Sequence, residues 1–162
     1  MKILFSPSEA KTVVSPNKFI DRNDFIFPNS YEKRCEILKI YDDFLQTATV
    51  EKISKLFGVK NLTDEPSLRE SLFKKGAVKA ILRYDGVAYK HLDYRSLDSA
   101  AQEFIDKNTL IFSNLFGPAT AADMLPEYKL KQGERIDGLN LEEFYSCLLY
   151  TSPSPRDRTR SR

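Results

Sequence analysis

The chain has 162 residues, of which 41% are hydrophobic and 30% charged, and its 25 basic and 23 acidic residues give a net charge of +2. These values are typical of one globular domain and exclude a disordered chain, and no run of about 18 apolar residues that could span a membrane occurs. Two cysteines and one histidine exclude a disulfide framework and a Cys/His metal cluster, which favours a cytoplasmic protein without a metal or another cofactor.

The first half of the chain predicts one strand and three helices. Residues 2–5 form an apolar run typical of a buried strand. Pro7 ends this run too early for it to be the apolar part of a signal peptide. A polar surface loop is expected over residues 8–28. Apolar spacing predicts three helices, over residues 29–47, 50–57 and 65–75. Asn29 is the expected N-cap of the first helix, and Gly58 is expected to end the second. Their expected core-facing residues include Leu38, Tyr41, Leu45, Ile53, Leu56, Leu68 and Leu72.

The next segment predicts a hairpin and a further helix. Residues 80–84 are typical of a strand, and Asp85-Gly86 is a strong turn signal that would return the chain through residues 87–89. Ser96 is expected to open a fourth helix whose apolar face includes Phe104.

The remaining pattern completes a mixed α/β domain. Residues 109–112 are β-branched and aromatic, which predicts another buried strand. Turn residues dominate the segment 114–133, and residues 141–146 are typical of the first turns of a helix. The predicted fold class is therefore α/β, with one domain over residues 1–146.

Residues 147–162 differ from the rest, with four arginines, one aspartate and no apolar side chain after residue 150. Residues 147–157 read as an in-frame translation of a transposase adapter used in sequencing libraries, so we interpret 147–162 as a disordered, adapter-derived tail. A basic arm that binds nucleic acid is the alternative. Without the tail, 21 basic and 22 acidic residues remain, so overall charge is no evidence for nucleic-acid binding.

Two segments could contact phosphate. Lys11 and Thr12 follow the first predicted strand, where a cation, a hydroxyl and backbone N–H groups can face one anion, although the loop has no glycine and could be an ordinary surface loop. Phe57-Gly58-Val59 fits the hairpin of a helix-hairpin-helix, and its neighbouring lysines would add charge. These lysines are Lys52, Lys55 and Lys60. An ordinary helix with a glycine C-cap is the alternative.

Other reactive residues have no partner at motif spacing. Ser113, Asp123 and Cys35 form no recognisable nucleophilic triad, so no catalytic residue is assigned. Cys35 is expected to be an inert core thiol and His91 an exposed surface histidine. The further lysines 74, 75 and 79 alternate with acidic residues, which favours a solvated surface.

Three segments along the chain hold residues that together form a recognisable pattern. The loop after the first predicted strand holds Ser6, Pro7, Ala10, Lys11 and Thr12. The later two segments hold Ala80, Ile81, Leu82, Gly86, Tyr89, Leu115, Phe116, Gly117, Asp123, Tyr128, Leu130 and Gly133. In this order the segments resemble the YaaA family of bacterial peroxide-stress proteins. The first is similar to the family's Ser-Pro-Ala-Lys-Thr signature with two residues inserted, and the others are similar to its hairpin and its last motif. The family's Arg-Pro pair falls on Thr120-Ala121, and the family continues beyond this point.

The resemblance implies a cytoplasmic protein that limits iron-dependent peroxide damage and binds double-stranded DNA in a charged cleft. It also implies a compact YaaA-like fold with a helix-hairpin-helix, incomplete in this chain, and no established reaction. Phosphate contacts would then come from Lys11, Thr12, Lys52, Lys55, Gly58 and Lys60.

Two alternatives remain open. The protein could be an enzyme that binds a phosphorylated or nucleotide substrate at Lys11-Thr12 and uses Asp123 or Tyr89 to transfer protons. An incomplete domain could also expose a sheet edge, aggregate and have no stable function.

Overall fold

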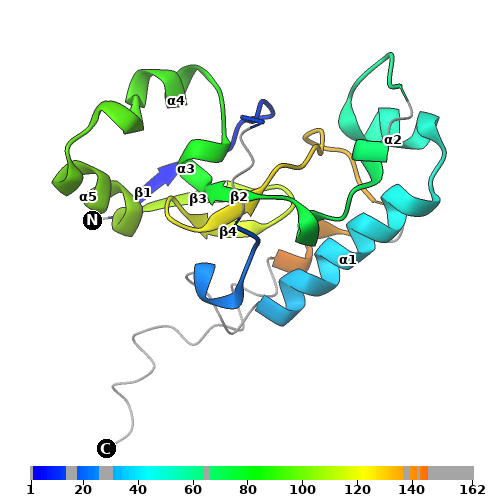
Figure 1. The fold of residues 1–162 in the computed structure, drawn as a ribbon, viewed down its shortest axis with the longest axis horizontal. Coiled ribbons are helices and arrows are strands. Elements are labelled where there is room, and N and C mark those ends of the chain that lie inside the picture. The colour runs from blue at the N-terminus through cyan, green and yellow to red at the C-terminus, as the bar shows by residue number, and fades with distance from the viewer. Residues whose placement is uncertain are drawn as a thin grey trace, which may run out of the picture.

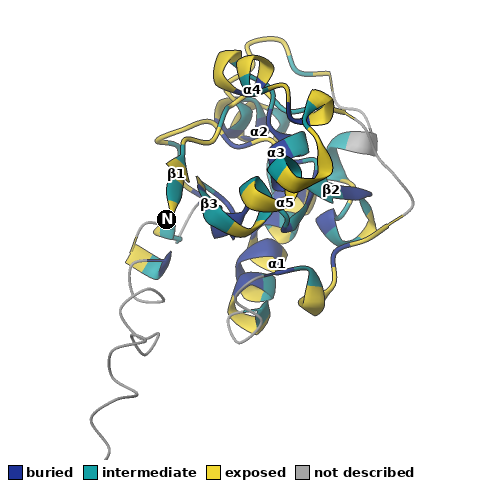
Figure 2. Cartoon of the chain, turned by 90° about the vertical axis from the view of Figure 1, so that its left-hand side faces the viewer, coloured by how far each residue is buried: buried dark blue, intermediate teal, exposed yellow. Residues whose placement is uncertain are grey.

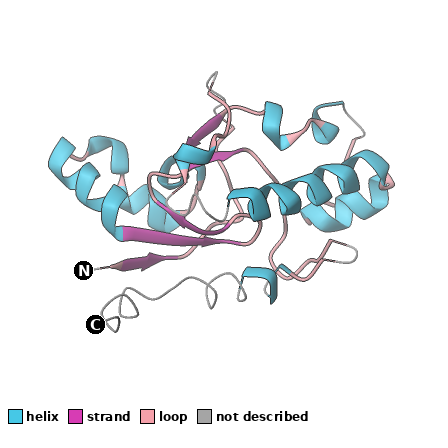
Figure 3. Cartoon of the chain, turned by 90° about the horizontal axis from the view of Figure 1, so that it is seen from below, coloured by secondary structure: helices cyan, strands magenta, loops and turns pink. Residues whose placement is uncertain are grey.

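The structure is a computed structural model and describes residues 2–13, 18–25, 31–63, 66–136, 139–141 and 143–145. Two small sheets lie at its centre, with α1 and α2 at one end and α4 and α5 at the other (Figures 1 and 3). No helix in these ranges has both the length and the apolar composition needed to cross a membrane. The predicted cap Asn29 and the segment 147–162 lie outside the described residues.

The first sheet has the order β1-β3-β4. β1 (Ile3–Phe5) runs parallel to β3 (Thr109–Ser113), so both predicted strands exist, and β3 pairs antiparallel with β4 (Gly117–Thr120). The predicted burial of the first strand is wrong, because β1 lies at an edge of this sheet and Leu4 is 70% exposed. The second sheet pairs β2 (Ala77–Lys79) antiparallel with β5 (Met124–Pro126). β4 and β5 lie in the segment where turn residues dominate the sequence and no strand is predicted. They form because pairing with β3 and β2 outweighs the weak local strand preference of this segment.

The two N-terminal helices confirm the prediction. α1 (Tyr31–Thr47) and α2 (Val50–Phe57) bury their apolar faces, which include Ile37, Leu38, Tyr41, Leu45, Ile53 and Leu56. Gly58 ends α2 with a φ of +70°, and its N–H donates to Lys55 O at 3.1 Å. The left-handed conformation explains why glycine stands at this C-cap.

The hairpin predicted over residues 80–89 is wrong, because this segment forms α3 (Ala80–Arg83) and α4 (Val87–Leu92). The Ala80 N–H donates to Asp123 O at 2.7 Å, and the Lys90 N–H donates to Gly86 O at 2.9 Å. Gly86 has an extended φ of −177°. Short apolar runs fit a helix and a strand equally well, so tertiary contacts decide this segment.

The single helix predicted over residues 65–75 is also wrong. It is replaced by two 3-10 turns, Pro66–Arg69 and Leu72–Lys74. Between them the Asp42 carboxylate of α1 accepts from Ser71 Oγ at 2.6 Å and from the Leu72 N–H at 3.1 Å. This long-range contact interrupts the helix.

The fourth predicted helix exists but begins later than expected. α5 (Ser99–Asn108) is capped by Asp98, which accepts from the Ala101 N–H at 2.8 Å, whereas Ser96 belongs to a preceding 3-10 turn. Phe104 is 44% exposed instead of buried. Figure 2 shows the exposed residues on the outer sides of α4 and α5.

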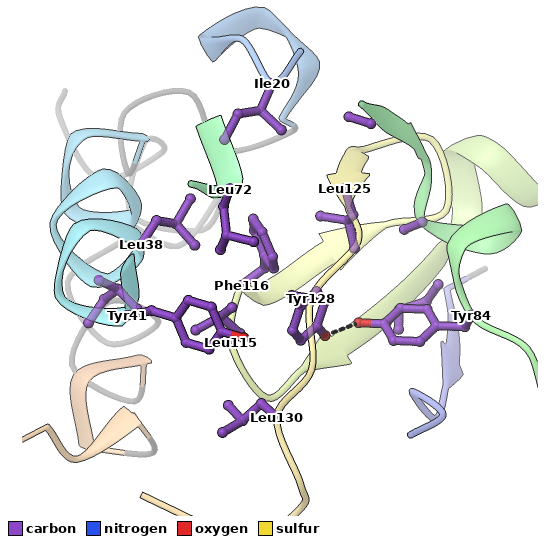
Figure 4. Close-up of a cluster of buried hydrophobic side chains, with 14 of the residues drawn as sticks. Ile20, Leu38, Tyr41, Leu72, Tyr84, Leu115, Phe116, Leu125, Tyr128 and Leu130 are labelled. Carbon is purple, nitrogen blue, oxygen red and sulfur yellow. Dashed lines mark hydrogen bonds between the residues drawn. The ribbon is translucent and has the colours of Figure 1, made fainter. Parts of the chain in front are cut away.

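The core lies between α1 and the strands (Figure 4). Leu38 and Tyr41 of α1 face Leu72, Leu115 and Phe116 there. Two arginines, Arg34 and Arg83, are also buried in this interior. A buried guanidinium requires hydrogen-bond acceptors, and both side chains donate to main-chain carbonyls.

Candidate functional site

The loop after β1 and the end of β3 meet at one edge of the first sheet, because the two strands are parallel. Residues 6–12 follow β1, and Ser113 and Asn114 stand at the end of β3. This carboxyl edge is where α/β proteins commonly place ligand-binding groups. Tyr84 and Tyr128 approach each other beside it (Figure 4).

Tyr128 is the centre of a buried hydroxyl network. Its hydroxyl lies 2.8 Å from Tyr84 Oη and 2.8 Å from Ser113 Oγ, and Asn114 Oδ1 lies at 3.2 Å. Burial raises the pKa of both tyrosines, so both remain neutral phenols. The network therefore joins α3 to β3 and to the segment after β5.

Lys11 lies over these tyrosines. Its Nζ is 4.3 Å from the centroid of the Tyr128 ring and donates to Glu9 O at 3.1 Å. Burial lowers the pKa of Lys11 to about 8, against the opposing effect of the Glu9 carboxylate. The ring face attracts the ammonium group, while the loss of solvent weakens its hold on the proton.

Thr12 is placed beside Lys11, but its hydroxyl is already bonded. Thr12 Oγ1 donates to Leu82 O at 2.9 Å, and the Thr12 N–H donates to Arg83 O at 2.9 Å. The donor groups of this residue are thus directed to α3, which gives Thr12 a role in anchoring the loop.

A basic surface surrounds α2. Lys52 and Lys55, both exposed, line a pocket of about 180 Å³ with Arg135. Lys131 covers Gly58, where an added Cβ would lie 2.8 Å from the lysine Cδ. The sequence interpretation missed Arg135 and Lys131, because only the fold brings them to α2.

The helix-hairpin-helix is not formed in the described residues. The N–H groups of Gly58 and Val59 donate to Lys55 O and Ser54 O, so they are used in the C-cap. Residues 58–63 and 66–79 contain no α-helix that could follow the hairpin. Lys60 is exposed just beyond the cap, and the ordinary glycine C-cap is the correct interpretation of this motif.

The segment after β5 connects the Lys11 loop to the basic surface. The Gln132 N–H donates to Glu9 Oε1 at 3.2 Å, and the Lys131 N–H donates to Leu56 O at 2.8 Å. The two groups of phosphate-binding candidates, far apart in sequence, are therefore joined through one segment.

The N-terminal and central motif residues contact one another. Tyr89 Oη donates to Ser6 O at 2.8 Å, and Ser8 Oγ donates to Asp85 O at 2.6 Å. A Cβ on Gly86 would lie 2.8 Å from Ser8 Oγ, which explains the glycine. Pro7 is exposed in the same loop. The hydroxyl of Tyr89 thus holds the loop after β1.

The motif residues near the end have structural contacts. Gly117 has a φ of +69°, and a side chain there would overlap the ring of Tyr145. Asp123 is 3% exposed and accepts a hydrogen bond from the Thr120 hydroxyl. Gly133 has a φ of +83° with open space around it. Burial of Asp123 keeps its carboxylate away from the surface that a ligand would approach.

The remaining candidates lie elsewhere. Cys35 is half-buried on α1, where burial raises the pKa of its thiol, and His91 is exposed on α4. Lys79 binds Asp106 at 2.6 Å. Across the described ranges, no group of three His, Cys, Asp or Glu side chains is arranged to hold a metal ion.

Comparison with known proteins identifies relatives over nearly the whole chain. The family model for "Peroxide stress protein YaaA" matches residues 1–154. A Campylobacter jejuni protein, Cj0984, is 43% identical over 145 residues, which are 90% of this chain and 59% of that protein. A UPF0246 protein of Corynebacterium glutamicum is 33% identical over 84% of this chain and 53% of its own length. The chain thus spans between about half and three fifths of these relatives.

Proposed function

The chain belongs to the peroxide stress protein YaaA family, and we propose that it binds duplex DNA through phosphate contacts as part of protection against peroxide stress. The observation that carries this proposal is the basic surface on α2, formed by Lys52, Lys55, Lys131 and Arg135. Exposed cations on a well-ordered helix can bind phosphate oxygens without reading the base sequence.

The fold supports the proposal by fixing these cations. Leu56 is buried in α2, and its carbonyl accepts from the Lys131 N–H, so this bond holds Lys131 next to the helix. The Lys131 ammonium lies 3.8 Å from Glu134, so part of its charge is offset, while Lys52, Lys55 and Arg135 add three more cations to this surface. Lys11 adds a charge on the connected loop while its amine is protonated.

The cellular role is proposed on the family membership. We propose that the protein acts in the cytoplasm and limits iron-dependent oxidative damage to DNA. Bound protein would shield the phosphate backbone, and the contacts would be independent of sequence.

The test compares two charge-matched double variants of the 162-residue chain by fluorescence anisotropy with a labelled duplex. Lys52→Ala/Lys55→Ala is expected to weaken binding at least tenfold, because two phosphate contacts are lost. Lys90→Ala/Lys107→Ala removes the same charge from α4 and α5, at the other end of the molecule, and is expected to change binding little. Equal losses in both variants would overturn the assignment to α2.

A further inference from the structure

A second pocket, of about 480 Å³, lies apart from the lysines of α2. It is bounded by α1, by the end of α2, by residues 68–76 and by residues 127–129. Its volume is that of a small-molecule site. We propose that this pocket binds one unstacked nucleotide, with its base against the aromatic lining and its phosphate on the lysines.

The lining is suited to a flat aromatic group. Four aromatic side chains line the pocket, together with three aliphatic ones. The aromatic residues are Phe19, Tyr41, Phe57 and Tyr128, and the aliphatic residues are Val13, Leu45 and Leu68. Phe19 is 54% exposed and Val13 is 74% exposed. A large apolar side chain left open to solvent at the mouth of a pocket offers a surface on which a base can stack.

The exposure of Phe19 does not come from a loosely held backbone. The carbonyl of Lys18 accepts from the Ala77 N–H at 2.7 Å, and the Lys18 ammonium binds Asp24 at 2.6 Å. On the other side, Ile20 belongs to the core. Both neighbours are fixed, so the phenyl ring is presented from a defined position.

The walls of the pocket are held by buried polar contacts. The Arg83 guanidinium donates to Thr12 O at 2.6 Å, to Gly76 O at 3.0 Å and to Leu125 O at 3.1 Å. Tyr41 Oη donates to Lys129 O at 2.7 Å from the opposite side. The pocket is therefore preformed, which lowers the entropic cost of binding a ligand.

The charges around the pocket fit a phosphate next to a heterocycle. Lys74, Lys75 and Lys129 line it, and none of the three forms an ion pair with a carboxylate in the described part of the chain. Glu70 and Glu127 are also in the lining and can accept hydrogen bonds from the N–H groups of a base. Aromatic stacking, carboxylate acceptors and available ammonium groups together match a nucleotide.

The nucleotide could be free or could belong to DNA, and the second case rests on the proposed function. Deoxyadenosine monophosphate is the probe for the first case, in a calorimetric titration. The second case is tested by comparing a fully paired duplex with one that carries a single unpaired nucleotide. Phe19→Ala is the test variant, and Phe104→Ala is its matched control, because Phe104 is 44% exposed on α5.

Phe19→Ala is expected to weaken nucleotide binding about fivefold or more, as the loss of one base–aromatic stack implies. Phe104→Ala is expected to have no effect. If Phe19→Ala weakens only the binding of the mononucleotide, the pocket takes a free nucleotide. If Phe19→Ala removes the preference for the duplex with an unpaired nucleotide, the pocket takes a nucleotide of DNA. Either result supports the site. Unchanged binding of both probes in Phe19→Ala would overturn it. Both Phe variants keep the α2 lysines that carry the proposed duplex binding. The mononucleotide titration therefore tests the pocket on its own, and a protein that fails to bind duplex DNA would leave its result unchanged.

Discussion

Arg83 donates its Nη1–H to the carbonyl oxygen of Thr12 at 2.6 Å, which joins α3 to the loop after β1. The same guanidinium reaches Gly76 O and Leu125 O and is fully buried. The loop that carries Lys11, a strand of the second sheet and the segment before β2 are thus organised around one side chain.

Replacing Arg83 with methionine is expected to destabilise the protein by about 3 kcal/mol or more, because three buried carbonyls lose a charged donor. Urea denaturation measures this loss of unfolding free energy. Arg95→Met, at an exposed position, is the control and is expected to change stability little. Similar free energies of unfolding for the two variants would contradict the central role of Arg83.

Lys11 predicts a specific pH dependence of stability. Its pKa is lowered from 10.5 to about 8 in the folded protein, so between these values the unfolded chain binds more protons. The contribution of Lys11 to the free energy of unfolding therefore rises between about pH 8 and about pH 10.5. We expect the wild type to gain stability relative to Lys11→Met over this range in urea denaturation. Parallel pH profiles for the two proteins would contradict the lowered pKa.

Two of the glycines with a positive φ, Gly58 and Gly133, allow the cost of backbone strain to be measured separately from the loss of a contact. Alanine at either position is expected to cost about 1 kcal/mol through its positive φ. Only Gly58→Ala also displaces Lys131, because Gly133 has open space around it. Thermal unfolding and duplex binding are measured for both variants. Weaker binding is expected for Gly58→Ala alone, and equal binding by the two variants would exclude Lys131 from the proposed DNA-binding surface.

Tyr128 is expected to contribute more stability than Tyr84 through its hydroxyl. Tyr128→Phe leaves Tyr84, Ser113 and Asn114 without this partner and is expected to cost about 1–3 kcal/mol. Tyr84→Phe removes the bond to Tyr128 and an interaction with Ser113 but keeps the bonds of Tyr128 to Ser113 and Asn114, so it is expected to cost less. Urea denaturation of both variants tests the order, and a larger loss for Tyr84→Phe would contradict the network.

The sequence predicted those elements whose signals are local. α1 and α2 follow from apolar spacing and from the glycine at position 58, and β1 and β3 follow from short apolar runs. Two short helices, α3 and α4, stand in place of the predicted hairpin. The Ala80 N–H at the start of α3 donates to Asp123 O, far along the chain, and a short apolar segment carries no sign of that contact.

The candidate site was predictable only in part. Lys52 and Lys55 were assigned from a glycine-ended helix, although the second helix of that motif is not present among the described residues. Arg135 and Lys131 reach the same surface through the bond between the Lys131 N–H and Leu56 O. No sequence spacing predicts that contact.

The salt dependence of duplex binding by the 162-residue chain tests the central claim most directly. The logarithm of the observed association constant is measured against the logarithm of salt concentration for the wild type and for Lys52→Ala/Lys55→Ala. Loss of two phosphate contacts predicts a slope shallower by about 2 in the double variant. An identical slope in the two proteins would contradict phosphate binding by these lysines.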